Sequence, residues 1–297
     1  MKVDNKPRQE RIKIKIRPLR HYPEFEECVA IQKEVWKLED VEATPVHQFC
    51  LGTQMGHILL GAFIQNQLVG FVYSFPSIFQ GRLSHHSHLL AVRPQYQGLG
   101  IGKKLKWAQR EVALKLGLDL ITWTVDPLQA KNANLNLRTL GAITRIYWDN
   151  FYGYSPALLL GPNIPTDRFL MEWWIKSPRV TERLKEAKGK KFQQRKYQID
   201  ELTIAVNSEL LDPGRLKPDK VKLKLKDEII FISLPNDIRS YSQEPWLIAA
   251  WQQAIRKAMK HYFKQGYAVS DFIFGDRSFY VLERLEKIKG LNLRVKR

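Results

Sequence analysis

Glycine alternates with apolar residues at residues 97–102, between an apolar run and a run of helical spacing. Because glycine has no Cβ, a loop of this composition can bring a row of backbone N–H groups close to a phosphate. A helix that begins at the end of the loop would add its free N-terminal amides and the positive end of its dipole. Lys103 and Lys104 add charge at the same place. The segment therefore predicts a pyrophosphate site.

Two common phosphate loops do not fit this segment. A Walker A loop needs Gly-x-x-x-x-Gly-Lys-Ser/Thr, but Gln97 stands at the first glycine and Lys104 at the hydroxyl position. A dinucleotide loop needs Gly-x-Gly-x-x-Gly, but Lys103 stands at the third glycine. The segment does fit a third pattern, Gln/Arg-x-x-Gly-x-Gly/Ala, directly after a predicted strand that ends in Ala91-Val92.

The elements around the loop form an ordered series. Two apolar, β-branched runs across a short polar turn predict a hairpin, and apolar residues at three- and four-residue spacing predict a helix after the loop. A dinucleotide fold would instead place its glycine loop after the first strand, with no meander before it. The predicted elements are strands at 58–64, 68–74 and 85–92, a helix from Ile101 that stops at Gly117, a strand at 120–125, a helix at 132–140 and a strand at 143–148.

In this setting the glycine loop resembles the acyl-CoA-binding loop of the GNAT acyltransferase superfamily. The superfamily resemblance covers about residues 12–174. A closer likeness, to a bacterial branch with a C-terminal extension around Gly266-Tyr-x-Val-x-Asp-Phe272, runs to about Glu283. The resemblance implies an α+β fold, in which a GNAT-type mixed sheet is flanked by helices and followed by a second, smaller α+β domain. Members of the branch have been linked to acylation of amino acids.

The resemblance also implies which residues bind the acyl-CoA. Backbone groups of the strand before the loop would grip the pantetheine arm and polarise the thioester carbonyl, and the loop amides would cradle the pyrophosphate. Lys103 or Arg93 would meet further phosphates, and an asparagine would bind the pantetheine or the sulfur. The expected cofactor-binding residues are Leu90, Val92, Gln97, Gly98, Leu99, Gly100, Ile101, Gly102, Lys103, Asn132 and Asn136.

Acyl transfer from a thioester to an amine needs a proton acceptor, and the family often places it five residues before the final Ala of the strand, here His86. Histidine titrates near neutrality and so suits this role. The alternative is that His85, His86 and His88 only form hydrogen bonds within the sheet. The family's usual proton donor, a tyrosine, is replaced by Leu137. We expect Tyr152 to act as the acid in its place, with Tyr147 nearby in sequence.

Composition limits the remaining function classes. The 297 residues, 44% of them hydrophobic, suffice for a packed core and more than one domain. Cys28 and Cys50 lie in apolar surroundings and are expected to be buried, reduced thiols. No metal-ligand spacing occurs, no apolar run reaches about eighteen residues, and the polar N-terminus is unlike a secretory signal. We expect a cytoplasmic protein with no metal and no membrane contact.

The formal net charge of +18 attracts anions such as acyl-CoA and nucleic acid. It is concentrated in the N-terminal tail, in a cluster from Arg183 to Lys196, and in the alternating lysines 220–226. We expect the last group to be a strand with one wet face whose lysines guard a sheet edge. No sequence-reading motif accompanies the charge, so a solvated basic surface is favoured over a nucleic-acid partner.

Four regions are expected from composition and pattern. Residues 1–11 form a basic tail, 12–176 the GNAT domain, 177–197 a basic linker and 198–297 a C-terminal α+β domain. In that last domain we expect strands at 202–206, 220–225, 228–234, 267–274 and 278–282, a helix packed by Trp246 and Trp251, and a frayed tail from residue 283.

The sequence as a whole predicts an acyl-CoA-dependent N-acyltransferase. It would move an acetyl or succinyl-like group to the amine of a small molecule, such as an amino acid, by direct attack in a ternary complex. The alternatives are a non-catalytic protein that binds CoA or an anionic metabolite, and an RNA- or ribosome-associated acetyltransferase. Monomer and homodimer both stay open.

Overall fold

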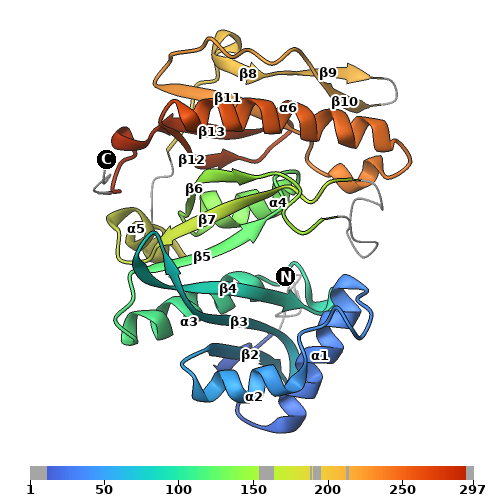
Figure 1. The fold of residues 1–297 in the computed structure, drawn as a ribbon, viewed down its shortest axis with the longest axis vertical. Coiled ribbons are helices and arrows are strands. Elements are labelled where there is room, and N and C mark those ends of the chain that lie inside the picture. Colours follow the sequence, from blue (N-terminus) through green and yellow to red (C-terminus); the bar gives the residue numbers. More distant parts are fainter. Residues whose placement is uncertain (1–11, 154–163, 188, 190–194, 212–213, 292–297) are drawn as a thin grey trace, which may run out of the picture. The chain divides into compact units, whose positions relative to one another are not determined.

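The computed structural model describes residues 12–153, 164–187, 189, 195–211 and 214–291. The chain divides into two compact units. The first unit comprises Met1–Ser74 and Leu89–Gln109, and the second comprises Phe75–His88 and Arg110–Arg297. Strands β3 (Gln67–Phe79) and β4 (Arg82–Val92) and helix α3 (Ile101–Lys115), all labelled in Figure 1, have residues in both units by this division.

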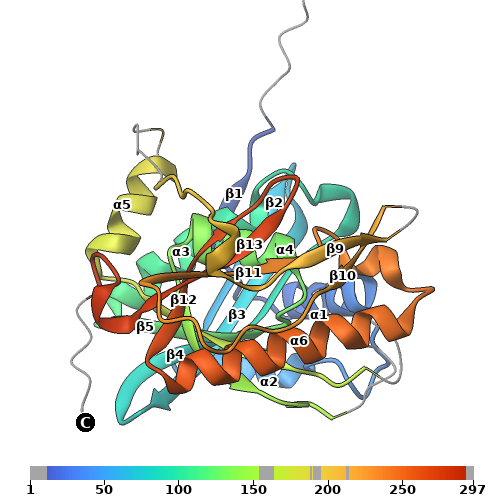
Figure 2. The ribbon, with the colours of Figure 1, turned by 90° about the horizontal axis from the view of Figure 1, so that it is seen from above.

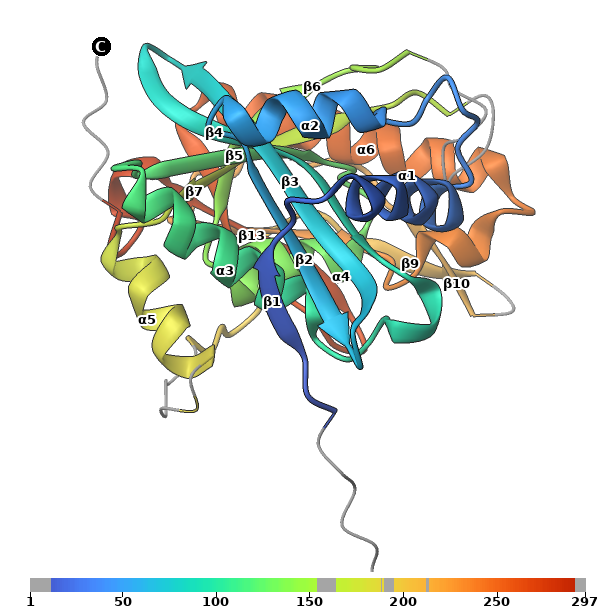
Figure 3. The same ribbon diagram turned by 90° about the horizontal axis from the view of Figure 1, so that it is seen from below.

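The first unit contains β1 (Lys15–Pro18), β2 (Ile58–Ile64) and parts of β3 and β4, in that order across the sheet. The pairs β1–β2 and β2–β3 are antiparallel, which confirms the predicted hairpin. Helices α1 (Tyr22–Trp36) and α2 (Val46–Gln54) lie beside these strands (Figure 3). Phe49 of α2 is fully buried, with its ring 5.0 Å from that of Tyr73 on β3. This aromatic packing joins the helices to the sheet.

The second unit carries the sheet order β4-β5-β7-β6-β12-β13-β11-β8. Strand β5 is parallel to β4, and β7 lies antiparallel between β5 and β6. Strand β12 of the C-terminal extension joins β6 at the pair Val269–Thr144, so the extension continues the sheet of this unit. The strands are β5 (Leu120–Val125), β6 (Ile143–Trp148), β7 (Arg168–Trp174), β8 (Ile204–Val206), β11 (Ile229–Leu234), β12 (Tyr267–Ile273) and β13 (Ser278–Arg284).

Helix α6 (Pro245–Lys264) confirms the predicted amphipathic helix of the extension and lies against its strands (Figures 1 and 2). Trp251 is fully buried on its inner face, and its indole N–H donates to Leu216 O at 2.8 Å. Trp246 was expected on the same face, but it is 61% exposed. It stands in the first turn of the helix, where the side chain extends away from the core.

Shorter elements complete the described chain. The turn Pro94–Tyr96 is a 3₁₀ helix, and α4 (Ala130–Ala133) passes directly into a π-helical segment, Asn134–Thr139. Helix α5 (Pro178–Ala187) lies within the predicted linker, and β9 (Ser208–Leu211) pairs with β10 (Arg215–Pro218). Further 3₁₀ turns lie at Glu201–Thr203, Ile238–Tyr241 and Leu285–Lys287. No helix in the described ranges is long and apolar enough to cross a membrane.

The lysine segment, residues 220–226, is an extended chain without the regular strand predicted for it. Asp219 N donates to Asn207 O at 2.9 Å and Lys222 N donates to Ala205 O at 2.8 Å, so the segment covers the outer side of β8. The side chains of Lys222, Lys224 and Lys226 are exposed. Regular pairing does not form because β8 is short, with only Ile204–Val206.

Two predictions about charged segments need correction. The tail from residue 283 does not fray at its start: Ile288 and Leu291 are buried against Ile143 and Ala268. In the basic cluster, Arg183 is buried, with its guanidinium 3.4 Å from Asp271 Oδ2. Its charge is therefore balanced inside the protein and does not belong to the solvated surface. The predicted tail at residues 1–11 and the last residues, 292–297, lie outside the described residues.

Candidate active site

The glycine loop leaves β4 through the Pro94–Tyr96 turn and enters α3. Gly98 and Gly100 have φ values of +83° and +73°, which glycine adopts without steric cost. Gly102 already belongs to the helix, where a Cβ would meet only Leu90 Cδ2, at 3.8 Å. The alternation therefore has two causes: two glycines permit the backbone turn, and the third gives open space at the helix start.

The backbone N–H groups of residues 98–103 donate to no acceptor within the described part of the chain. The first bond of the turn is Lys104 N to Gly100 O, at 3.1 Å. Residues 97–100 are exposed, and Ile101 is buried under the helix. Amides without an acceptor among the described residues, at a helix start with the dipole behind them, are an arrangement that can bind an anion.

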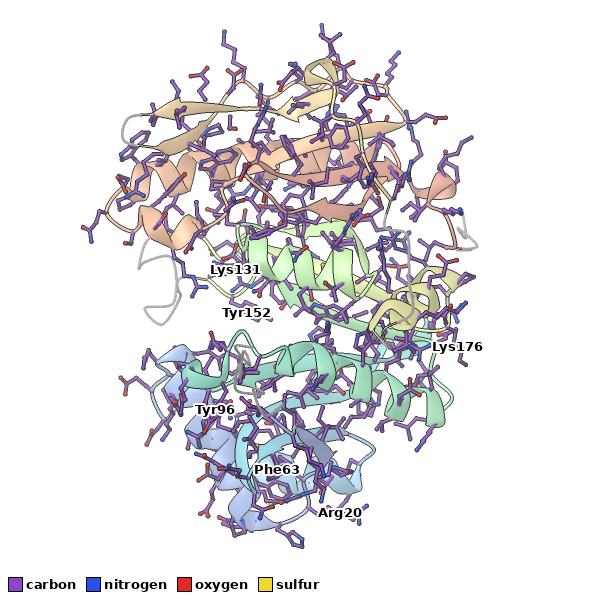
Figure 4. All side chains as sticks on the ribbon, turned by 180° about the vertical axis from the view of Figure 1, so that it is seen from behind. Arg20, Phe63, Tyr96, Lys131, Tyr152 and Lys176 are labelled. Carbon is purple, nitrogen blue, oxygen red and sulfur yellow. The ribbon has the colours of Figure 1, made fainter. Side chains whose placement is uncertain are left out.

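Side chains of the first unit hold this loop in place. Gln97 Nε2 donates to Val92 O at 3.0 Å and closes the loop onto the end of β4. Tyr96, labelled in Figure 4, donates its hydroxyl to Gln67 Oε1 at 3.0 Å. Gly70 of β3 is a supporting residue that the sequence analysis missed: a Cβ there would stand 2.6 Å from Ala91 O. Its signal was a single glycine inside an apolar strand, which often marks close backbone approach.

Two cationic residues near the loop differ in their availability. The Arg93 guanidinium binds Glu27, at 2.5 Å, and also Glu34, and its Nε donates to Leu68 O at 3.2 Å. Arg93 thus ties the end of β4 to α1, so the expectation that it meets a phosphate finds no support in its contacts. Lys103 is half-buried in the first turn of α3.

The second unit places His86 on β4 opposite Thr122 of β5, with His86 Nδ1 3.1 Å from Thr122 Oγ1. The His86 side chain is half-buried, and the Phe75 ring lies 5.5 Å from its ring. His85 points to the other face and is buried. His86 is therefore held on one face of the sheet by an aromatic contact and a hydroxyl.

Tyr152 follows β6 and is 51% exposed (Figure 4). Its hydroxyl lies 2.9 Å from Thr124 Oγ1, and the Arg168 guanidinium lies 5.3 Å from the ring centre. Thr122 and Thr124 are two residues apart on β5, so they share a face about 7 Å apart. The structure thus brings His86 and Tyr152 to one face of β5, each beside a threonine. The alternation Thr-Trp-Thr was the signal for this pair, and the sequence analysis did not use it.

Tyr147 has a different environment from Tyr152. Its hydroxyl donates to Asp167 Oδ2 at 2.6 Å. Burial, followed by the negative charge of Asp167, raises the pKa of Tyr147 well above its usual value. This tyrosine keeps its proton in a structural bond, and of the two residues Tyr152 is the more exposed.

The helical segment after β5 has mixed burial. Asn132 is exposed, whereas Asn136 is buried and its carbonyl accepts the N–H of Ala142 at 3.0 Å. Leu137, where the resemblance led us to expect a tyrosine in relatives, is 1% exposed and packs in the core. The π-helical turns here, with Leu140 N bonded to Leu135 O at 2.9 Å, are a form that is frequent at functional sites.

A comparison with models of protein families matches one of them to this part of the chain. The model described as the acetyltransferase (GNAT) family matches residues 21–142, which include β2 to β5, the glycine loop and α3. A search of curated proteins gives no significant match. The match covers the loop, His86 and both β5 threonines.

Several solved structures resemble the chain. The ribosomal-protein-S18-alanine N-acetyltransferase from Escherichia coli is 15% identical, covers 55% of this chain and 94% of its own, and has a TM-score of 0.44. The paia N-acetyltransferase from Thermoplasma acidophilum, in complex with coenzyme A, is 18% identical, covers 54% and 98%, and scores 0.39. An aminoglycoside acetyltransferase from an uncultured soil metagenomic sample is 20% identical, covers 41% and 84%, and scores 0.37.

Proposed function

Residues 21–142 belong to the GNAT acetyltransferase family, and from this premise we propose that the protein is an acyl-CoA-dependent N-acyltransferase. It transfers an acetyl or succinyl-like group to the amine of a small molecule, by direct attack within a ternary complex. Acyl-CoA is the co-substrate, and the reaction as proposed uses no metal.

The observation that carries this proposal is the row of unpaired amides at residues 98–103. A diphosphate brings several acceptor oxygens and negative charge, which a helix N-terminus with free N–H groups binds well. Lys103 adds a cation at the same turn. The backbone of Leu90 and Val92, on the strand that leads into the loop, is assigned to the pantetheine arm.

His86 and Tyr152 supply the proton transfers in this proposal. The amine nitrogen attacks the thioester carbonyl carbon, the N–C bond forms and the C–S bond breaks. When His86 Nδ1–H donates to Thr122 Oγ1, Nε2 is the basic nitrogen that takes the amine proton. Tyr152 Oη then protonates the departing CoA thiolate, and Thr124 orients that hydroxyl. Asn132 and Asn136 are assigned to the pantetheine or the sulfur.

An amino acid or another small amine is the proposed acceptor. The extension and both proton-transfer residues belong to the second unit, which supports a role for the extension in holding the acceptor. Localisation in the cytoplasm belongs to the same proposal, because acyl-CoA is made and used there.

Calorimetry with CoA, followed by a thiol-release assay, tests the proposal. We expect heat on CoA binding, and thiol release when acetyl-CoA or succinyl-CoA meets one member of a panel of amino acids, polyamines and peptides. Mass spectrometry of the products then identifies the acylated amine. Binding without any thiol release would make the protein a sensor of CoA, and the absence of binding would remove the assignment of the loop.

Salt-sensitive binding to RNA, lost when the lysine segment is neutralised, would instead favour an RNA- or ribosome-associated acetyltransferase.

A further inference from the structure

Helix α6 of the extension contacts the connection between β6 and β7 at one residue per turn. Gln252 Nε2 donates to Pro165 O at 2.6 Å, and Lys260 Nζ lies 2.6 Å from Asp149 Oδ2. Arg256 lies between them, and residues four apart project from the same face of a helix. One face of α6 therefore holds both ends of this connection.

Arg256 makes the central contact. Its Nε lies 2.7 Å from Asp167 Oδ2 and its Nη2 lies 2.8 Å from Asp167 Oδ1, so the guanidinium binds both carboxylate oxygens. The Asp167 side chain is fully buried, and the Arg256 side chain is 28% exposed. The bonds to Asp167 raise the pKa of Arg256. A buried carboxylate held by such a fork has its orientation fixed as well as its charge balanced.

Asp167 also binds the backbone around residue 150. Its Oδ1 accepts the N–H of Asn150 at 3.0 Å, and Asn150 Oδ1 accepts the N–H of Thr166 at 3.1 Å. Asn150 has φ +43°, a left-handed conformation that asparagine adopts more readily than most residues. These two hydrogen bonds together connect Asn150 to Thr166 and Asp167.

The same link ends at Tyr152. The N–H of Phe151 donates to Thr166 O at 2.9 Å, and the N–H of Tyr152 donates to Thr166 Oγ1 at 2.7 Å. The Tyr152 hydroxyl meets Thr124 on β5. The backbone of Tyr152 is thus set by contacts that lead, through Thr166 and Asp167, to Arg256.

We propose that Arg256 is a positioning residue for Tyr152, so that the C-terminal extension sets the geometry of the proton donor. The inference rests on the proposed function for the role of Tyr152, but its structural part stands on the hydrogen bonds alone. In this proposal the extension contributes to the reaction through Tyr152, although Arg256 itself does not contact the substrates.

A double-mutant cycle tests the catalytic part. Arg256→Lys keeps the charge and loses the fork, and we expect kcat to fall about tenfold with KM for acyl-CoA unchanged, since small displacements of a catalytic group have effects of this order or larger. In a Tyr152→Phe background the same change is expected to cause no further loss. Lys257→Gln, which alters the exposed neighbour in the same turn, is the control with unchanged rate. Independent, multiplying losses would overturn the inference, whereas a fully active Tyr152→Phe enzyme would contradict the acid role in the proposed function.

Hydrogen exchange tests the positioning without turnover. In Arg256→Lys we expect the amides of Phe151 and Tyr152 to exchange several-fold faster than in the unmodified protein, because their acceptor Thr166 loses its support. Lys257→Gln should exchange at the unmodified rate. Unchanged exchange of a peptide that spans residues 147–153 would overturn the inference even if the enzyme is active.

Discussion

Thr122 and Thr124, both on β5, each contact one of the two proposed proton-transfer residues, His86 and Tyr152. The Thr122 hydroxyl lies 3.1 Å from His86 Nδ1, and the Thr124 hydroxyl lies 2.9 Å from the Tyr152 hydroxyl. Because both threonines belong to one short strand, the spacing of the two hydroxyls is set by the strand's rise per residue. The two candidate residues are thus each in contact with a hydroxyl of the same strand.

His86→Ala is expected to lower turnover at neutral pH by about a hundredfold, because general acid–base catalysis contributes 10²–10⁴-fold. The dissociation constant of CoA should be unaltered, since the loop belongs to the other unit. Steady-state kinetics and calorimetry measure the two effects. Thr122→Val, which removes only the hydroxyl beside Nδ1, should give a smaller loss. Unchanged turnover of His86→Ala would remove this residue from the mechanism.

The two cysteines differ in burial. Cys28 is fully buried in α1, and burial, with the nearby charges of Glu24 and Glu27, raises the pKa of its thiol. Cys50 is half-buried, and neither forms a disulfide. A thiol reagent at neutral pH should therefore modify Cys50 first and Cys28 only on unfolding, because the thiolate is the reactive form. Cys50→Ser should abolish the fast phase, and a fast phase that persists in this variant would contradict the assignment.

At the level of elements, the glycine loop permits a matched pair of substitutions. Gly100→Ala forces a side chain into a left-handed conformation that costs about 1–2 kcal/mol, so we expect CoA to bind about tenfold more weakly. Gly102→Ala places a methyl group in ordinary contact with Leu90 inside a helix, so binding should be retained. Calorimetry on both variants, with melting temperatures as a folding control, measures this. Equal affinities would mean that the turn does not shape the site.

Local pattern predicted the elements that carry the loop. The hairpin at β2–β3, the strand before the loop and the helix after it follow from alternation and helical spacing, and the structure confirms all three. The glycines at 98 and 100 were predicted for their missing Cβ, and the structure adds that both have positive φ. Such features depend on neighbours in sequence, which one chain displays directly.

Long-range pairing was beyond the sequence analysis. The link from Arg256 to Asp167 joins residues 89 apart, and nothing in either neighbourhood marks them as partners. The short strand β8 and the buried Ile288 likewise depend on what packs against them. Tertiary contacts of this kind override local propensity, as the irregular lysine segment shows.

At the level of the whole molecule, the extension and the sheet of the second unit share strand pairs. Removal of residues 198–297 would leave β6 without β12 and Asp167 without Arg256. Loss of one partner of a buried ion pair costs about 3–5 kcal/mol, so we expect residues 1–197 not to fold cooperatively. Circular dichroism melts and gel filtration would show this. A monomeric fragment with a sharp transition would mean that residues 1–197 fold without the extension, as the sequence-based division proposed.

The lysine segment beside β8 has a consequence for the behaviour of the protein in concentrated solution. The outermost strand of a sheet is the natural place for a second molecule to add its own backbone. Here that place is already taken by a chain that is too irregular to accept another strand and that carries a row of ammonium groups outward. The ammonium groups of two copies that approach by this border repel each other, so the same residues that raise the charge of the protein disfavour the addition of a strand at this edge.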